Sequence, residues 1–294
     1  MLFGIAALAL VSLPGVSEGQ TSIEDRLAPG QPPVVISSRA RGGGAPDNSL
    51  AGIQYAIDRG VDMVEVHIQP TRDGKYILMR DMRLTDGTNV TDIFPDGAPS
   101  LAGSALSRRG LTNDYTLEEI AQLRLKDPQG GDHPVPDLGE ALDLAQGQVF
   151  VLLALQRWDN ATLVPLLKRY NPSEILLFTR YGNQRALQEA AEATGIGVAT
   201  FLNVSNVEGQ LEEDLERFNS LLRMIYVTSD QLTPALIAKA KHHRVAIAIV
   251  GAAYNDEDDA LINGNSGPWL AAFDSGAAAF LTKYPDAVLK LLGR

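Results

Sequence analysis

The sequence contains no cysteine, which excludes disulfide bonds, lipidated cysteines and metal sites built on paired cysteines. Histidine is scarce, with four in 294 residues. Basic residues are fewer than acidic ones: the chain has 25 Lys and Arg and 36 Asp and Glu, which gives a formal net charge of −11. We therefore expect neither general nucleic-acid binding nor attraction to anionic membranes, since both need concentrated positive charge. There is also no Walker loop and no Gly-x-Ser-x-Gly elbow.

The first residues have the pattern of an export signal. Leu2 to Val16 is mostly apolar, and Ser17 and Gly19 offer small residues for cleavage. The alternative is a membrane anchor, but the run is shorter than the roughly 20 residues that span a bilayer, so we expect no stable membrane insertion. We predict a signal peptide at 1–19 for export to the periplasm or the medium, a linker at 20–33, and one domain at 34–294. A domain of this length can be stable without disulfides.

Strand-like and helix-like patterns alternate along most of the chain. Eight strands are predicted, each followed by helical material, at 34–38, 63–69, 149–156, 174–180, 198–204, 224–229, 245–251 and 278–282. This number of units is typical of a (β/α)8 TIM barrel, with a doubly wound open sheet as the alternative. Residues 76–80 follow the second strand after a tight turn, so we expect an extra antiparallel hairpin strand. Residues 85–113 are rich in Gly, Asp, Ser and Pro and predict an irregular loop insertion.

Short motifs match one enzyme family in order and spacing. They are Ser38-Arg39-Ala40, Pro46-Asp47-Asn48-Ser49, Glu65-Val66-His67-Ile68, the turn Arg72-Asp73-Gly74, Arg80-Asp81, Val135-Pro136-Asp137-Leu138-Gly139-Glu140 and Leu281-Thr282-Lys283-Tyr284-Pro285. In these motifs the sequence resembles the glycerophosphodiester phosphodiesterase family, a group of phospholipase-C-like phosphodiesterase barrels. The resemblance covers 34 to about 156 and returns at 276–286. It implies a TIM barrel and phosphoric diester hydrolysis in lipid metabolism.

The resemblance also implies a mechanism, which this sequence does not retain. In the family, two histidines act as general acid and base, carboxylates hold Ca²⁺ or Mg²⁺, and an arginine and a lysine hold the phosphate. The histidine positions fall on Ser38 and Arg80. Serine does not titrate near neutral pH and arginine does not release its proton, so neither replaces an imidazole. Ser38 either fills space or is a nucleophile without a base. Arg80 either clamps an anion or pairs with Glu65 or Asp81.

The phosphate-holding positions are partly changed. Arg39 matches the family arginine, whose forked guanidinium suits a phosphate, although it could instead pair with Glu65 or Asp47. Gln156 replaces the lysine, and Ala154 replaces a distal glutamate that would bind metal. We expect Arg39, Arg80 and Gln156 to contact a ligand.

The metal-holding positions are changed as well. Glu65 is retained, but His67 replaces the family aspartate, and an imidazole favours Zn²⁺ over Ca²⁺ or Mg²⁺. Glu65, His67 and Asp47 are therefore the candidate ligands of a divalent metal. The alternatives are a hydrogen-bonded Glu65–His67 pair without metal, and Asp47 or Asn48 as a helix N-cap. With the distal ligand replaced, we expect no cofactor.

Two function hypotheses follow. The first is a family member that is non-catalytic or very weakly active and binds a small anionic phosphodiester or polyol phosphate between Arg39 and Arg80, or serves as an interaction scaffold. The second is a metal-dependent hydrolase with a rearranged site around Glu65 and His67, to which His133 in a loop could contribute. The adjacent His242 and His243 are expected to be cations at the C-terminus of a helix.

Overall fold

The computed structural model describes residues 21–180, 183–202, 204–251 and 257–294. The export signal predicted at 1–19 lies outside these residues and stays a prediction. Within the described ranges, no helix combines the length and the apolar composition that a membrane span requires.

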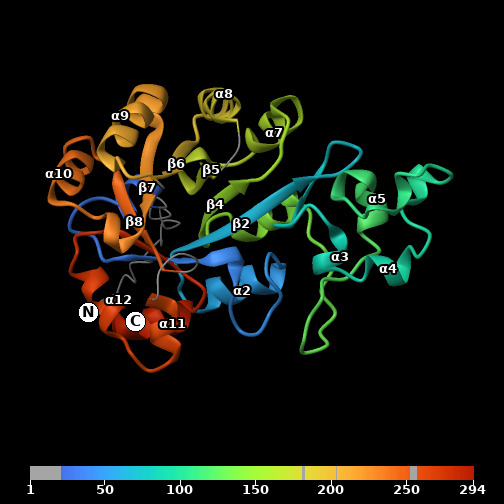
Figure 1. Ribbon diagram of the computed structural model, residues 1–294, viewed down its shortest axis with the longest axis horizontal. Helices are drawn as coiled ribbons and strands as arrows, with labels where there is room; N and C mark the ends of the chain where they lie inside the picture. The colour runs from blue at the N-terminus through green and yellow to red at the C-terminus, as the bar shows by residue number, and fades with distance from the viewer. Residues whose placement is uncertain (1–20, 181–182, 203, 252–256) are drawn as a thin grey trace, which may run out of the picture.

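The described residues form a closed barrel of eight parallel strands (Figure 1). Their order is β1-β9-β8-β7-β6-β5-β4-β2, and pairing of β1 with β2 closes the ring. The strands are β1 (Val34–Ser37), β2 (Met63–Pro70), β4 (Phe150–Leu155), β5 (Ile175–Phe178), β6 (Gly197–Phe201), β7 (Leu222–Val227), β8 (Ala246–Val250) and β9 (Ala279–Thr282). The predicted TIM barrel is confirmed, and the open sheet is excluded because β1 pairs on both sides.

Helices surround the barrel and connect its strands. They are α2 (Leu50–Asp58), α6 (Leu138–Ala145), α7 (Asn160–Leu167), α8 (Gln184–Thr194), α9 (Val207–Phe218), α10 (Pro234–His242), α11 (Glu257–Ile262), α12 (Gly267–Phe273) and α13 (Pro285–Leu291). Their ends follow local sequence signals. For example, Asp137 and Glu140 form a reciprocal capping box at the start of α6.

Alternation along each strand separates two hydrophobic layers. Val64, Val66 and Ile68 of β2 pack outward against the helices, in a cluster that also contains Ile53 of α2. Met63 of β2 belongs to a second cluster, which fills the barrel interior with side chains from the other strands. Because successive side chains point to opposite faces, the residues that follow Met63 at every second position continue up the inside of the barrel.

The predicted linker is not a simple connection. Within it, α1 (Ile23–Arg26) is a single helical turn with a capping box between Ser22 and Asp25. Ile23 and Leu27 are buried and belong to the cluster inside the barrel. This segment therefore contributes to the packing of the barrel, which differs from the linker expected at 20–33.

The extra hairpin strand is confirmed. β3 (Tyr76–Leu78) runs antiparallel to β2, with Ile68 opposite Leu78 and Pro70 opposite Tyr76. It lies outside the ring of parallel strands.

The insertion occupies the whole segment between β3 and α6 (79–137), and it is more ordered than the composition of 85–113 predicts. It contains the one-turn helices α3 (Leu84–Gly87), α4 (Val90–Ile93) and α5 (Leu117–Ile120), with three 3₁₀ turns between α4 and α5. Its apolar side chains form a separate hydrophobic cluster with Ile77 and Met79, which includes Tyr115 and Leu123. Figure 1 shows this insertion beside the barrel, at the end of the long strand β2, rather than over the ring of helices.

Candidate functional site

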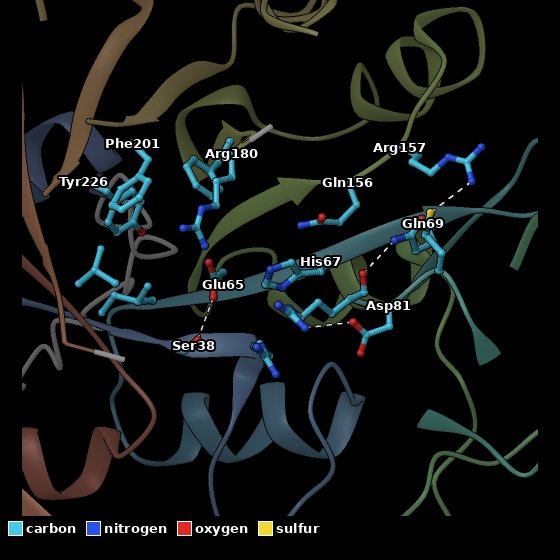
Figure 2. A pocket seen from close by; sticks show the side chains of 16 residues that line it. Ser38, Glu65, His67, Gln69, Asp81, Gln156, Arg157, Arg180, Phe201 and Tyr226 are labelled. Atoms are coloured by element: carbon cyan, nitrogen blue, oxygen red, sulfur yellow. Dashed lines mark hydrogen bonds and ion pairs between the residues drawn. The ribbon is translucent and has the colours of Figure 1, made fainter. Parts of the chain in front are cut away.

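Inward-facing residues at the carboxyl ends of the strands line a cavity of about 380 Å³ (Figure 2). β2 contributes Glu65, His67 and Gln69. The other strands and the residues just after them contribute Ser38, Gln156, Phe178, Arg180, Phe201, Tyr226, Val250 and Leu281. These positions continue the alternation of the barrel core. The carboxyl end of the barrel is where TIM barrels bind their ligands, so this cavity is the candidate site.

Arginine dominates the charge of the cavity. Arg39, Arg80, Arg157 and Arg180 line it, together with the carboxylates of Glu65 and Asp81. Arg157 lies at the rim, where it is exposed and its Nη1 donates to Met82 Sδ at 3.5 Å. The lining thus contains four arginines and two carboxylates, in a chain whose formal net charge is −11. This local excess of positive charge favours an anionic ligand over a cation.

Arg39 and Arg80 are each held by one neighbouring aspartate. Arg39 Nη1 donates to Asp47 Oδ2 at 3.1 Å, and Arg80 Nη1 donates to Asp81 Oδ1 at 3.0 Å. The ion-pair alternatives with Asp47 and Asp81 are thus present in the structure. They do not exclude anion binding, because a guanidinium carries five N–H donors and each of these contacts uses one.

Arg180 enters the cavity from the end of β5. Its Cζ atom lies 5.2 Å from the centroid of the Phe201 ring, a distance typical of a cation–π contact. Figure 2 shows its side chain reaching into the cavity above Glu65. The aromatic ring of Phe201 therefore positions a third guanidinium within the same cavity.

Glu65 is fixed by Ser38, the residue at the first family histidine position. Ser38 Oγ donates to Glu65 Oε2 at 3.0 Å, and both side chains are buried. Ser38 thus does more than fill space, and it does have a neighbouring carboxylate. Tyr226 stands across the cavity, where burial, and then the negative charge of Glu65, raise the pKa of its hydroxyl well above the ordinary value of 10.0. The phenol therefore stays a neutral hydrogen-bond donor.

His67 is a buried, neutral imidazole. Its side chain is 7% exposed, and its backbone N–H donates to Asn48 Oδ1 at 2.8 Å. Burial lowers the pKa of His67 below the ordinary value of 6.5; Glu65 opposes this effect, and the positive charges of Arg39 and Arg80 add to it. Among the described residues, no hydrogen bond joins His67 to Glu65, so the alternative of a bonded Glu65–His67 pair is wrong.

Three buried polar atoms of the cavity lack a partner within the described part of the chain. They are His67 Nδ1, Gln69 Oε1 and Tyr226 Oη. Buried polar groups in proteins are nearly always hydrogen-bonded, because an unmade bond leaves the cost of desolvation uncompensated. Donor and acceptor atoms of this kind, on facing walls of an arginine-lined cavity, fit a ligand that carries hydroxyl groups as well as a negative charge.

Asp47 is not part of the cavity. Its carboxylate lines a neighbouring groove and receives Arg41 Nε at 2.8 Å and Arg41 Nη2 at 2.9 Å. Burial would raise the pKa of Asp47, but its hydrogen bonds and ion pairs with Arg41 and Arg39 hold it below the ordinary value of 3.8. The N-cap of α2 is Ser49, whose Oγ accepts from Gly52 N at 3.0 Å, so the expected cap at Asp47 or Asn48 is also wrong.

The donor set does not fit the family's divalent metal. No group of three or more His, Cys, Asp or Glu side chains among the described residues is placed to hold an ion. Glu65 and His67 share the cavity, but Asp47 is engaged elsewhere by two arginines. The predicted three-residue metal site is therefore not brought together.

The remaining histidines lie away from the cavity. His133 Nε2 is 3.4 Å from Asp127 Oδ2, in the insertion, and does not line the cavity. It therefore does not complete the rearranged site. His242 is the last residue of α10 and His243 is its C-cap, as predicted.

Residues 39–195 match the model of the glycerophosphoryl diester phosphodiesterase family, which is more than half of the chain. The chain belongs to this family. Among curated relatives, a glycerophosphodiester phosphodiesterase from Caldanaerobacter subterraneus subsp. tengcongensis is 23% identical over 161 residues, covering 51% of this chain and 58% of that protein. Glycerophosphodiester phosphodiesterase 1 from Homo sapiens is 40% identical over 96 residues, covering 30% and 28%. This chain thus spans under two thirds of the length of either relative.

Solved structures of glycerophosphodiester phosphodiesterases share the fold over nearly the whole chain. A glycerophosphoryl diester phosphodiesterase from Parabacteroides distasonis superposes with a TM-score of 0.70 at 18% identity, covering 92% of both chains. A phosphodiesterase from Oleispira antarctica, solved in complex with the product sn-glycerol-3-phosphate, has a TM-score of 0.66 at 21% identity, covering 90% of this chain and 98% of that one. At these identities the likeness concerns the fold.

Several lining residues of this glycerophosphodiester phosphodiesterase-family barrel were not among the predicted site residues. Arg180, Phe201 and Tyr226 carry no family motif, and Arg157 lies just after β4. Gln156, which was predicted, does line the cavity. The alternation of side chains along each predicted strand could have identified Arg180, Phe201 and Tyr226, because the inward-facing residue at the end of a barrel strand lines the cavity.

Proposed function

We propose that this protein binds a small anionic phosphodiester or polyol phosphate in the cavity and is non-catalytic, or very weakly active, toward it. The observation that carries the proposal is the set of arginines around the cavity, Arg39, Arg80, Arg157 and Arg180. A phosphate accepts several charge-assisted hydrogen bonds from guanidinium groups, which are among the strongest hydrogen bonds in proteins. Tyr226 Oη, His67 Nδ1 and Gln69 Oε1, which have no hydrogen-bond partner among the residues that the structure describes, provide matching sites for hydroxyl groups.

The residues at the family's catalytic positions support weak or absent hydrolysis. Ser38 and Arg80 occupy the positions of the general acid and base, and neither transfers a proton near neutral pH. Loss of each proton-transfer group costs on the order of a hundredfold to ten-thousandfold in rate. His67 and Ala154 replace the residues at two of the family's metal-holding positions, so Glu65 is the one position of five that keeps its family residue. The ligand class agrees with the glycerol phosphate bound by the Oleispira structure.

A binding measurement tests the proposal. We expect sn-glycerol-3-phosphate to bind the purified protein in isothermal titration calorimetry. Arg39→Ala and Arg80→Ala should each weaken binding by about tenfold or more, because a hydrogen bond to a charged group contributes about 1.5–3 kcal/mol. Arg108→Ala is the matched control, since Arg108 is exposed and pairs with Asp96 outside the cavity. Equal affinities for all four proteins would contradict the proposal.

Hydrolysis is the second candidate function, and one observation favours it. The imidazole of His67 is neutral and lines the cavity, and its Nδ1 has no partner within the described ranges of the chain, so it can accept a proton from water or a hydroxyl. An assay on glycerophosphodiesters with Ca²⁺, Mg²⁺, Mn²⁺ or Zn²⁺ separates the two functions. Metal-dependent turnover that Glu65→Ala abolishes would end the non-catalytic proposal. Turnover that depends on His67 but not on added metal would assign a different mechanism to the same site.

A further inference from the structure

A second depression, which we call the outer groove, lies beside the cavity and opens into it. Its volume is about 740 Å³. Its walls come from the glycine-rich loop 41–48 after β1, from the insertion at 86–87 and 125–129, and from the segment 283–287 after β9. Arg39, Arg80 and Asp81 line both the cavity and the outer groove. The two spaces therefore meet at the arginines that hold the phosphate in the proposed function.

A phosphate at this junction has a separate space on each side. A phosphomonoester occupies only one of them, whereas a phosphodiester can place one alcohol in the cavity and the other in the outer groove. We infer that the outer groove is a second subsite, which receives the other arm of a diester whose phosphate lies at Arg39 and Arg80. This inference rests on the proposed function, and it gives the protein a preference for diesters over monoesters.

The polar groups of the outer groove define the arm that it takes. Three of the four carboxylates that line it form ion pairs: Asp47 with Arg39 and Arg41, Asp81 with Arg80, and Asp286 with Arg59 at 2.7 Å. Asp286 also accepts from the Tyr55 hydroxyl at 2.5 Å, and the fourth carboxylate, Asp86, accepts from Thr85 Oγ1 at 3.2 Å. These ion pairs offset most of the negative charge that a cationic arm would need, and Arg41, Lys126 and Lys283 add positive charge to the same lining. The groove is consequently a poor site for a quaternary ammonium group.

Lys283 supplies the donor in this groove. Its backbone N–H donates to Asp258 Oδ2 at 2.8 Å, which fixes the chain at the end of β9. Its ammonium group has no hydrogen bond or ion pair with the other described residues, and its side chain lines the groove. An ammonium group with three donors is suited to the oxygen atoms of a hydroxylated arm. The second subsite therefore selects a neutral polyol.

The insertion forms the facing wall and is firmly attached. Lys126 N donates to Gly87 O at 2.8 Å, and Lys126 Nζ donates to Thr85 O at 2.6 Å. Gln129 N donates to Asp127 Oδ1 at 2.8 Å, and this bond fixes the turn at 127–129. The exposed side chain of Gln129 lines the outer groove. These bonds make the insertion a fixed part of the second subsite.

The test compares three ligands by calorimetry on the full chain: sn-glycerol-3-phosphate, glycerophosphoglycerol and glycerophosphocholine. We expect glycerophosphoglycerol to bind about tenfold more tightly than the monoester, since one or two added hydrogen bonds to a charged group are worth that factor. Glycerophosphocholine should gain little. Lys283→Met, which keeps the apolar stem, should remove the advantage of glycerophosphoglycerol while leaving monoester affinity within about twofold. Lys290→Met on the outside of α13 is the control, and Gln129→Ala probes the opposite wall.

The outcomes separate this inference from the proposed function. If the monoester binds through Arg39 but the diester gains nothing, or if Lys283→Met weakens both ligands equally, the second subsite is overturned and the proposed function stands. If none of the three ligands binds, both are overturned. Tighter binding of glycerophosphocholine than of glycerophosphoglycerol would overturn the assignment of a neutral polyol arm.

Discussion

Ser38 and Arg80 stand at the two positions that the family resemblance assigns to histidines, within a barrel of the family's fold. Ser38 donates to Glu65 at 3.0 Å and holds its carboxylate in place. Arg80 adds a permanent positive charge at the junction of the cavity and the outer groove. An arginine that neutralises a phosphate stabilises the bound ester but supplies no proton to its leaving group. This is the physical reason why the proposed function is binding rather than hydrolysis.

The buried imidazole of His67 predicts a pH dependence of stability. Its pKa in the folded protein lies below 6.5, chiefly through burial, with Glu65, Arg39, Arg80 and Asp81 as the charged groups that face it. As the pH falls below 6.5, the unfolded chain binds a proton that the folded chain does not, so stability falls as well. His67→Gln should reduce the dependence of the free energy of unfolding on pH in this range.

Urea unfolding between neutral and mildly acidic pH measures this dependence. The exposed His242→Gln is the control for loss of an imidazole. Identical profiles for His67→Gln and wild type would contradict the burial of His67.

Tyr226 offers a test with a single-atom change. Tyr226→Phe removes the hydroxyl that has no partner among the described residues and keeps the ring that packs at 5.5 Å from Phe178. Without ligand, we expect thermal stability to be unchanged or slightly raised, because an unsatisfied buried hydroxyl is costly. Affinity for sn-glycerol-3-phosphate should fall by about twofold to tenfold, the value of one neutral hydrogen bond. Unchanged affinity would show that Tyr226 does not contact the ligand.

At the scale of elements, the loop after β1 carries the strain of the site. Arg39 and Ala40 have φ angles of 58° and 50°, in the left-handed region that non-glycine residues seldom adopt. Such conformations cost about 1–3 kcal/mol each and persist where the surroundings enforce them. Here α2 is the enforcing element, because Gly52 lies directly against the Ala40 carbonyl oxygen and a Cβ atom there would overlap it. The close approach of α2 thus places Arg39 at the junction of the cavity and the outer groove.

Gly52→Ala tests this role of α2. In an unconstrained helix the change should stabilise by about 0.5–1 kcal/mol, because glycine has the greater freedom in the unfolded chain. Here we expect the opposite sign in urea unfolding, and a loss of ligand affinity comparable to that of Arg39→Ala, since the loop must move away. A gain in stability with normal binding would show that the contact between Gly52 and Ala40 does not position Arg39.

The sequence predicted strands better than it predicted single helical turns. Strands such as β2 and β4 have alternating or continuous apolar patterns whose meaning does not depend on distant residues. One-turn helices have too few residues for a periodicity, so α1, α3 and α4 were not predicted. The signals for α1 were the capping pattern of Ser22 and Asp25 and the pair Ile23 and Leu27, four residues apart, whose burial depends on the barrel. Tertiary packing, which the sequence alone does not display, decides such segments.

At the scale of the whole molecule, the site combines parts that the sequence could and could not place. Arg39, Glu65 and His67 were predicted because motifs mark them. Arg180 and Tyr226 were not, although each is the inward-facing residue at or just beyond the end of a strand. The predicted metal ligands Glu65, His67 and Asp47 are not brought together, for a reason that lies outside the motifs. The engagement of Asp47 by Arg41 depends on the fold of a glycine-rich loop, which no spacing rule describes.

The two arginines at the junction belong to two different hydrophobic clusters of the molecule. Just after the hairpin strand β3, Met79 N donates to the His67 carbonyl oxygen at 2.9 Å, but its side chain packs in the hydrophobic cluster of the insertion. Arg80 follows Met79 in the chain. One guanidinium at the junction is thus carried by the closed barrel, and the other by an appendage whose hydrophobic cluster is its own. Substitutions in the insertion can consequently change the ligand specificity of the outer groove, while the core of the barrel, on which folding depends, is unaffected.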